Sequence, residues 1–207
     1  MPGRVWPLDC EQARTLLEAA RGDWLEALYA LAVTAGLRQG ELLGLRWEDV
    51  DLQNGTLQVR RALTTTKDGP KFTAPKTPKS RRSITLTAGA VDAPQWHHNR
   101  QYKESAELEG LWQDYGLVFA TRMGTPINRK RLHDCFKALL KSAKLPNIRF
   151  HDLRHTCATL LLSQNVNPKI VFEMLGHATI AITLDTYSHL LASMSEHAAA
   201  AKEQILE

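Results

Sequence analysis

The fold is best predicted from the stretch His151-Asp152-Leu153-Arg154-His155. Residues three or four positions apart share a helix face, so His151, Arg154 and His155 would form one stripe. Apolar residues at positions 153, 157, 160 and 161 fall on the opposite side, as expected for a helix that packs into a core. The pattern predicts a helix that is anchored inward and presents a cationic, titratable edge outward. Any one of the three side chains, taken alone, would fit a solvated helix face.

The composition is that of a globular protein. The chain has 207 residues, 43% of them hydrophobic, which is enough for a sizeable core. No apolar run approaches the roughly 20 residues that cross a bilayer. The first residues also lack a signal-peptide core, so we expect a cytoplasmic protein without a membrane partner. Three scattered cysteines without a CxxC pair argue against a disulfide framework and a structural zinc site.

Positive charge is concentrated in the middle of the chain. Residues 1–51 carry five Lys/Arg and nine Asp/Glu, a net charge of −4, whereas residues 60–154 carry nineteen and eight, a net charge of +11. Such asymmetry favours a polyanionic partner, with nucleic acid as the first candidate. Because many proteins have basic faces that bind nothing, the charge alone is weak evidence.

Two helices are expected before residue 36. Asp9 is a typical N-cap, and Gln12 three positions later completes a capping box. The second helix, at residues 24–35, is apolar on most sides and is expected at the centre of the domain. Gly36 is a suitable C-cap.

A charged pair follows the second helix. In Thr34-Ala35-Gly36-Leu37-Arg38-Gln39-Gly40-Glu41-Leu42, Arg38 and Glu41 lie three positions apart among apolar residues. Charged side chains are rarely buried without partners. A local Arg38–Glu41 ion pair explains this segment as well as a site into which Arg38 projects while Glu41 holds its neighbours in place.

A small antiparallel sheet is expected between residues 51 and 86. Asn54-Gly55 is a hairpin signal, and alternation predicts strands at residues 56–60, 71–74 and 83–86, with a polar loop at 64–70. The last two strands are joined by the basic turn Pro75-Lys76-Thr77-Pro78-Lys79-Ser80-Arg81-Arg82. A turn of this kind is usually solvated, but it is also suited to reach a phosphate.

Residues 88–113 are the least informative part of the chain. Their apolar spacing is poor, and Pro94 argues against a continuous helix. Adjacent residues on a helix face different directions, so His97 and His98 are interpreted as surface residues and not as a metal site. A short buried extended segment is expected at residues 117–120.

The last third of the chain is predicted to be helical. Asn128 is a suitable cap for a basic amphipathic helix reaching about residue 144. Pro168 begins a short helix that ends at Gly176-His177, and further helices are expected at residues 179–187 and 193–206. The chain is therefore predicted to be α+β and mainly α-helical, with a small three-stranded antiparallel sheet at one edge.

The charged and titratable residues suit phosphoryl transfer to a side-chain nucleophile. Paired guanidiniums can clamp phosphate oxygens and stabilise charge in the transition state. A tyrosine, whose reference pKa is about 10, needs cationic surroundings and a base such as histidine to attack. A lysine can protonate the leaving alkoxide. Asp152 and Glu41 stand isolated, so no carboxylate cage for Mg²⁺ is expected.

These residues carry a resemblance. The sequence resembles the catalytic domain of tyrosine recombinases, the phage-integrase family, through the ordered set of the 34–42 segment, the HxxRH stretch at 151–155, Leu175-Gly176-His177 and Tyr187. HxxR or LGH alone would be weak evidence. The ordered set spans residues 12–191 and is specific.

The resemblance implies six catalytic residues, which are Arg38, Lys76, His151, Arg154, His177 and Tyr187. The two arginines would clamp the phosphate, and His177 would hydrogen-bond to it. Tyr187 would be the nucleophile, forming a 3′-phosphotyrosyl link and freeing a 5′-hydroxyl. His151 would handle protons. Lys76 would be the general acid, with Lys79 as the alternative.

The resemblance also implies supporting residues. Glu41 matches the family's acidic position beside the site, and His155 is expected to buttress Arg154. The cations expected to contact DNA outside the site are Lys79, Arg81, Arg82, Arg129, Lys130 and Arg131.

The activity implied is that of a site-specific DNA recombinase, or integrase, that acts on double-stranded DNA without a metal or other cofactor. Self-association into a multimer on DNA is expected, as are accessory DNA-bending proteins. The family's N-terminal core-binding domain is not matched, so residues 1–207 are expected to be a catalytic domain, with residues 193–207 docking on a neighbouring subunit. The alternatives are a nicking-closing enzyme like type IB topoisomerases and a non-catalytic DNA-binding regulator, which would not need the Tyr187 hydroxyl.

Overall fold

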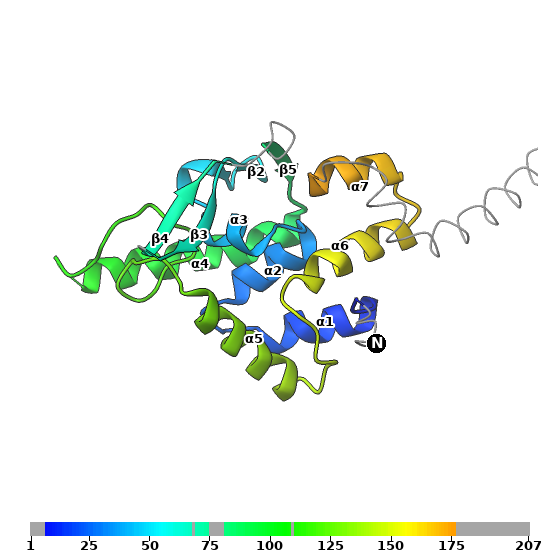
Figure 1. The fold of residues 1–207 in the computed structure, drawn as a ribbon, viewed down its shortest axis with the longest axis horizontal. Coiled ribbons are helices and arrows are strands. Elements are labelled where there is room, and N and C mark those ends of the chain that lie inside the picture. Colours follow the sequence, from blue (N-terminus) through cyan, green and yellow to red (C-terminus); the bar gives the residue numbers. More distant parts are fainter. Residues whose placement is uncertain (1–6, 68, 75–80, 109, 177–207) are drawn as a thin grey trace, which may run out of the picture.

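The computed structural model describes residues 7–67, 69–74, 81–108 and 110–176. Within these ranges the chain is mainly helical, as the sequence predicts, and it contains two small antiparallel sheets where one was expected (Figure 1). No helix in the described ranges is long and apolar enough to cross a membrane. The predictions for Lys76, Lys79, His177 and Tyr187, and for helices at 179–187 and 193–206, fall outside the described residues.

The first two helices form as predicted. Helix α1 (Cys10–Ala19) begins with a capping box, in which the Gln12 amide donates to Asp9 Oδ1 at 2.8 Å and the Asp9 amide donates to Gln12 Oε1 at 3.2 Å. Helix α2 (Glu26–Thr34) is buried on most of its circumference and packs against α1, α4 and α6. It forms the centre of the main hydrophobic core.

The three-stranded sheet is present, but one of its strands differs from the prediction. Strands β1 (Val50–Asp51), β2 (Thr56–Val59) and β5 (Arg82–Thr85) pair in the order β1-β2-β5, all antiparallel, with Leu57 opposite Ile84. The expected strand at 71–74 belongs to a separate hairpin of β3 (Ala62–Thr66) and β4 (Gly69–Thr73).

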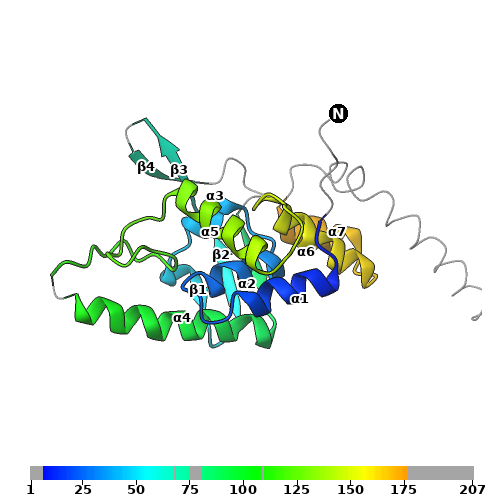
Figure 2. The same cartoon turned by 90° about the horizontal axis from the view of Figure 1, so that it is seen from below.

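The expected polar loop at 64–70 is therefore wrong. The β-branched threonines at 64–66 suit a strand, and β4 supplies the partner that satisfies their backbone groups. This hairpin projects from the body of the molecule, away from α4 (Figure 2).

Residues 88–113 contain a long helix that the sequence does not predict. Helix α4 (Ala88–Glu107) includes Pro94 in its interior and packs along α2. Its inner face is fixed by tertiary hydrogen bonds, because His97 Nε2 lies 2.6 Å from Val118 O and Gln101 Nε2 donates to Leu117 O at 3.2 Å. These contacts stabilise the helix despite the proline and the poor apolar spacing.

His97 is buried, so its interpretation as a surface residue is wrong. Burial lowers the pKa of His97 to about 4, and the backbone contact to Val118 only partly offsets this effect. Its Nδ1 lies 2.9 Å from the guanidinium of Arg100, which fits a neutral ring that accepts at Nδ1 and donates at Nε2. His98 is exposed, as expected.

The remaining elements surround the C-terminal end of α7, where Arg38 and Arg154 come together. The short α3 (Gln39–Leu43) and the 3₁₀ turn η1 (Trp47–Asp49) lead from α2 into the sheet. Helix α5 (Arg129–Ser142) begins at Asn128, whose side chain accepts from the Lys130 amide as predicted. Helices α6 (Asp152–Ser163) and α7 (Pro168–Leu175) share a small apolar cluster of Ala158, Leu162, Val171 and Leu175. This cluster directs the C-terminal end of α7 toward β5 and α3 (Figure 1).

Candidate active site

Arg38 lies at the start of α3, where the chain turns from extended backbone into the helix. Glu41 accepts from the Arg38 backbone amide at 2.9 Å and from Arg38 Nη1 at 2.8 Å. The predicted local ion pair is therefore present. It is not the whole arrangement, because Arg38 Nη2 also donates to the carbonyl of Gly176 at 2.8 Å. The Arg38 side chain remains 36% exposed, so it is partly accessible to solvent.

Glu41 is the buried acid of the site and is only 5% exposed. Besides Arg38, it receives a two-pronged contact from Arg82, whose Nη2 lies 2.9 Å from Oε2 and whose Nη1 lies 3.2 Å from Oε1. Burial alone would raise the pKa of Glu41, but the hydrogen bonds and charges of Arg82 and Arg38 hold that pKa below its usual range. Glu41 is thus held as a carboxylate that orients two guanidiniums.

Arg154 is buried, not part of an outward-facing edge as the helical stripe predicted. The residue is 3% exposed. Its guanidinium donates to Gly36 O at 2.8 Å and to Leu175 O. Burying a guanidinium is unfavourable unless its N–H groups are hydrogen-bonded, and these carbonyls satisfy that requirement. Gly36 adopts φ +60° beside the Leu175 and Cys157 side chains, a left-handed conformation that strongly favours glycine.

The C-terminal end of α7 brings the arginines together. Gly176 caps the helix at φ +63°, and its amide donates to the carbonyls of Phe172 and Glu173. The next three carbonyls each accept from a different arginine. The pairs are Met174 with Arg82, Leu175 with Arg154, and Gly176 with Arg38. Cations are favoured at this end of a helix dipole, so α7 places Arg38 and Arg154 on successive carbonyls immediately before position 177.

His151 lies one residue before α6 and is exposed to solvent. Its ring stands edge-on to that of His155, with ring centroids 5.4 Å apart. Partial desolvation lowers the pKa of His151, and the positive charges of His155 and Arg154 lower it further. A neutral imidazole at neutral pH is able to accept a proton. Desolvation also lowers the pKa of His155.

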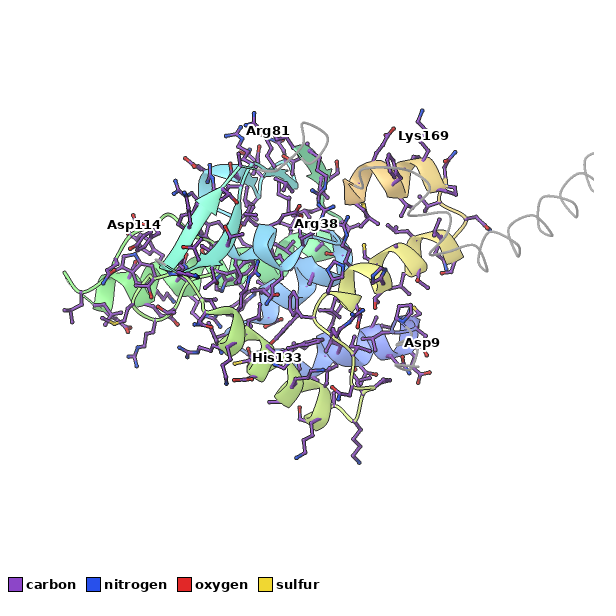
Figure 3. The ribbon with its side chains drawn as sticks, viewed as in Figure 1. Asp9, Arg38, Arg81, Asp114, His133 and Lys169 are labelled. Atoms are coloured by element: carbon purple, nitrogen blue, oxygen red, sulfur yellow. The ribbon has the colours of Figure 1, made fainter. Side chains whose placement is uncertain are left out.

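Two of the cations expected to contact DNA flank the three-stranded sheet. Arg81 is exposed immediately before β5. In Figure 3 it is labelled at the upper edge of the molecule, and Arg38 lies closer to the middle. A groove of about 580 Å³ beside it is lined by Gln58, Val59, Arg60, Arg81, Arg82 and Ser83. Arg82 differs from the expectation of a solvated basic turn, because its side chain is only 6% exposed.

The three cations of the first turn of α5 all have partners within the protein. Arg129 donates to Leu63 O at 3.3 Å, and Lys130, 83% exposed, pairs with Asp134 at 2.7 Å. The Arg131 guanidinium stacks on the Trp24 ring, 5.0 Å from its centroid. All three residues are exposed and lie at one end of the same helix, where they could contact a phosphate.

The burial of the Arg82 side chain was not predicted from the sequence. Arg82 stands at the end of a basic run, which is typical of a solvated turn. In a strand, however, residues two apart share a face, and Arg82 alternates with Ile84 and Leu86, both buried. That periodicity was the available signal. Among the described residues, no three His, Cys, Asp or Glu side chains gather in a way that could hold a metal.

The model of the phage integrase family matches residues 7–194 of this chain. A XerC-like tyrosine recombinase from Caldanaerobacter subterraneus subsp. tengcongensis is 34% identical over an alignment of 200 residues, which covers 91% of this chain and 51% of that protein.

Solved structures of recombinases and integrases are also similar to this chain. The Tn1549 transposon integrase in complex with circular intermediate DNA is 25% identical, with a TM-score of 0.76 over 94% of this chain and 68% of that one. The XerA recombinase is 25% identical, with a TM-score of 0.74 over 95% and 66%. The chain spans about half the length of the curated relatives it matches.

Proposed function

Because the chain belongs to the phage integrase family, we propose that it cleaves and rejoins strands of double-stranded DNA through a 3′-phosphotyrosyl intermediate, as a site-specific recombinase. The observation that carries this proposal is the convergence of Arg38 and Arg154 on the successive carbonyls of Gly176 and Leu175. Two guanidiniums held side by side suit the two non-bridging oxygens of one phosphodiester. The sequence that follows directly contains His177 and Tyr187.

In the proposed reaction the Tyr187 oxygen attacks the phosphorus and the bond from phosphorus to the 5′-oxygen breaks. The proton of the Tyr187 hydroxyl passes to His151, whose lowered pKa keeps the ring neutral and ready to accept it. Lys76 protonates the departing 5′-oxygen. Arg38, Arg154 and His177 stabilise the negative charge that develops on the phosphate. Attack of a 5′-hydroxyl on the phosphotyrosine reverses these steps and rejoins a strand.

The proposed partner is double-stranded DNA, contacted by exposed cations that include Arg81 and Lys130. We further propose cytoplasmic action as a multimer on DNA, with residues 193–207 docking on a neighbouring subunit and with accessory DNA-bending proteins. The solved Tn1549 integrase, itself bound to circular intermediate DNA, supports the choice of DNA as partner.

The decisive experiment is covalent trapping on a nicked suicide duplex, in which the fragment carrying the free 5′-hydroxyl diffuses away after cleavage. Wild-type protein in EDTA should form a protein–DNA adduct that survives denaturing electrophoresis. Tyr187→Phe should form none while still shifting the mobility of the duplex, because only the nucleophilic oxygen is removed. The exposed Tyr102 on α4 offers the matched control, since Tyr102→Phe should retain full adduct formation.

A wild-type protein that shifts DNA mobility and forms no adduct would support the non-catalytic regulator instead. Adduct formation that persists in Tyr187→Phe would assign the nucleophile elsewhere. A second assay separates the two enzymatic alternatives. A recombinase should join strands from two different duplexes, whereas a nicking-closing enzyme should only relax supercoiled DNA.

A further inference from the structure

The side chain of Arg82 is buried between Glu41 of α3 and the C-terminal end of α7. Its Nη1 and Nη2 atoms form the two-pronged contact with Glu41, and its Nε donates to Met174 O at 2.6 Å. A planar guanidinium presents its donors in a fixed fork, so a side chain that satisfies both partners can adopt essentially one orientation. Strand β5 is thereby linked both to α3 and to the end of α7.

Gly176 provides a second, independent observation that Arg82 packs closely against the end of α7. A Cβ at position 176 would lie 3.0 Å from Arg82 Cδ, 3.1 Å from Nη1 and 3.3 Å from Cζ. The Arg82 side chain therefore packs flat against the backbone of the residue that precedes His177. The separation of β5 from this backbone is set by direct contact.

Arg38 and Arg82 both connect Glu41 to α7, but they differ in exposure. The Arg38 side chain is 36% exposed and partly accessible to a ligand, whereas the Arg82 side chain is 6% exposed and covered. A phosphate that binds Arg38 competes with the bond from Arg38 to Gly176 O. The buried contacts of Arg82 with Glu41 and Met174 O do not face that competition. They can therefore keep Glu41 and α7 in fixed relative positions while Arg38 binds the substrate.

We propose that Arg82 is a positioning residue for the strand-cleavage reaction, fixing the Glu41 carboxylate that orients Arg38 relative to the end of α7 that precedes His177. This inference rests on the proposed function and deepens it. Arg82 does not touch the reacting atoms. It acts on the rate of cleavage and not on the affinity for DNA.

The test compares Arg82→Met with Arg14→Met, which removes one positive charge from an exposed position on α1. Single-turnover adduct formation on the nicked suicide duplex is measured at saturating protein, and affinity is measured by mobility shift in the Tyr187→Phe background. We expect Arg82→Met to lower the adduct rate about 30- to 100-fold, the size of effect that a misplacement of about 1 Å produces. Its affinity should stay within about threefold of wild type. Arg14→Met should keep the wild-type rate.

A double-mutant cycle separates positioning from general weakening of the fold. In a Glu41→Gln background the link is already broken, so Arg82→Met should lower the adduct rate by less than about threefold more. An Arg82→Met effect that multiplies fully with that of Glu41→Gln would overturn the proposal. So would a wild-type adduct rate in Arg82→Met.

Folding is monitored by urea denaturation in every variant. If Arg82→Met does not fold, Arg82→Lys takes its place, and a folded Arg82→Lys protein should show a rate between those of wild type and Glu41→Gln. Loss of the fold in both variants would overturn the proposal in favour of a purely structural role. Failure of the wild-type protein to form any adduct is a different result, because it rejects the proposed function itself.

Discussion

Two buried acids in this molecule each face two arginines, and their geometries differ. Glu41 receives hydrogen bonds from Arg38 and Arg82, and its pKa lies below the usual range despite burial. Asp49, in the 3₁₀ turn η1, has its carboxylate atoms within 3.5 Å of Arg60 and 2.9 Å of Arg61. Both of its oxygens are nevertheless buried without a hydrogen bond of good geometry.

The pKa values of Glu41 and Asp49 reflect this difference in hydrogen bonding. Burial raises the pKa of Asp49, and the charges of Arg61 and Arg60 do not fully offset the effect. Proximity of opposite charges is therefore not sufficient to stabilise a buried carboxylate, because desolvation must also be balanced by directed hydrogen bonds. The Glu41 cluster fixes the orientation of its guanidiniums, whereas the Asp49 cluster mainly neutralises charge beside the sheet.

The largest expected difference between the two clusters is in the free energy of unfolding when the acid of each is replaced by its amide. Glu41→Gln should lower the free energy of unfolding by about 3 kcal/mol, because it leaves two guanidiniums without their counter-ion and one of them, Arg82, is buried. Asp49→Asn should lower it by less than about 1 kcal/mol, since Arg61 keeps its 2.8 Å partner Glu48 and Arg60 is half exposed. Urea denaturation of both variants measures the difference, and equal losses would contradict the comparison.

A smaller effect on the free energy of unfolding is expected from replacing one arginine in each cluster by lysine. Arg82→Lys should reduce the free energy of unfolding by about 1–2 kcal/mol, because a lysine cannot donate to Glu41 and to Met174 O in the same geometry. Arg60→Lys should change it by less than about 0.5 kcal/mol, since the exposed pair is screened by water. The same urea titration applies, and an Arg60→Lys loss as large as that of Arg82→Lys would show that both clusters depend on geometry.

The smallest expected effect is on acid stability, where the two clusters should act with opposite sign. The pKa of Glu41 is lowered on folding, so its stabilisation is complete above the ordinary glutamate pKa of 4.5 and is lost as the pH falls below it. The pKa of Asp49 is raised, so its protonation favours the folded state as the pH falls toward 3.8. Between pH 6 and pH 3.5, stability should therefore fall less steeply in Glu41→Gln and more steeply in Asp49→Asn than in wild type. Equal slopes in all three proteins would exclude both contributions.

The sequence predicted those elements whose ends are stabilised by residues close by in the chain. The capping box at Asp9, the cap at Asn128 and the hairpin turn at Asn54-Gly55 each determine an element boundary through neighbours a few residues away. Helix α4 was not predicted, because its stability depends on hydrogen bonds from His97 and Gln101 to a segment some 20 residues further along the chain. No periodicity within residues 88–107 records those partners.

For the candidate site, too, the sequence indicated which residues take part but not how they are buried. Residue types and order indicated Arg38, Glu41, His151 and Arg154, and the structure brings Arg38, Glu41 and Arg154 to the end of α7. The burial of Arg154 could not be predicted, because it depends on the carbonyls of Gly36 and Leu175, which lie 118 and 21 positions away. The assigned roles of Lys76, His177 and Tyr187 stay predictions.

The run of accepted hydrogen bonds at the end of α7 also constrains the length of the chain there. Three side chains from α3, β5 and α6 each reach one carbonyl in an unbroken series. Inserting a single residue within α7 would rotate the whole series by about 100° and advance it by about 1.5 Å, so all three partners would be lost together. Substitutions along α7 can be absorbed one at a time, but insertions and deletions cannot.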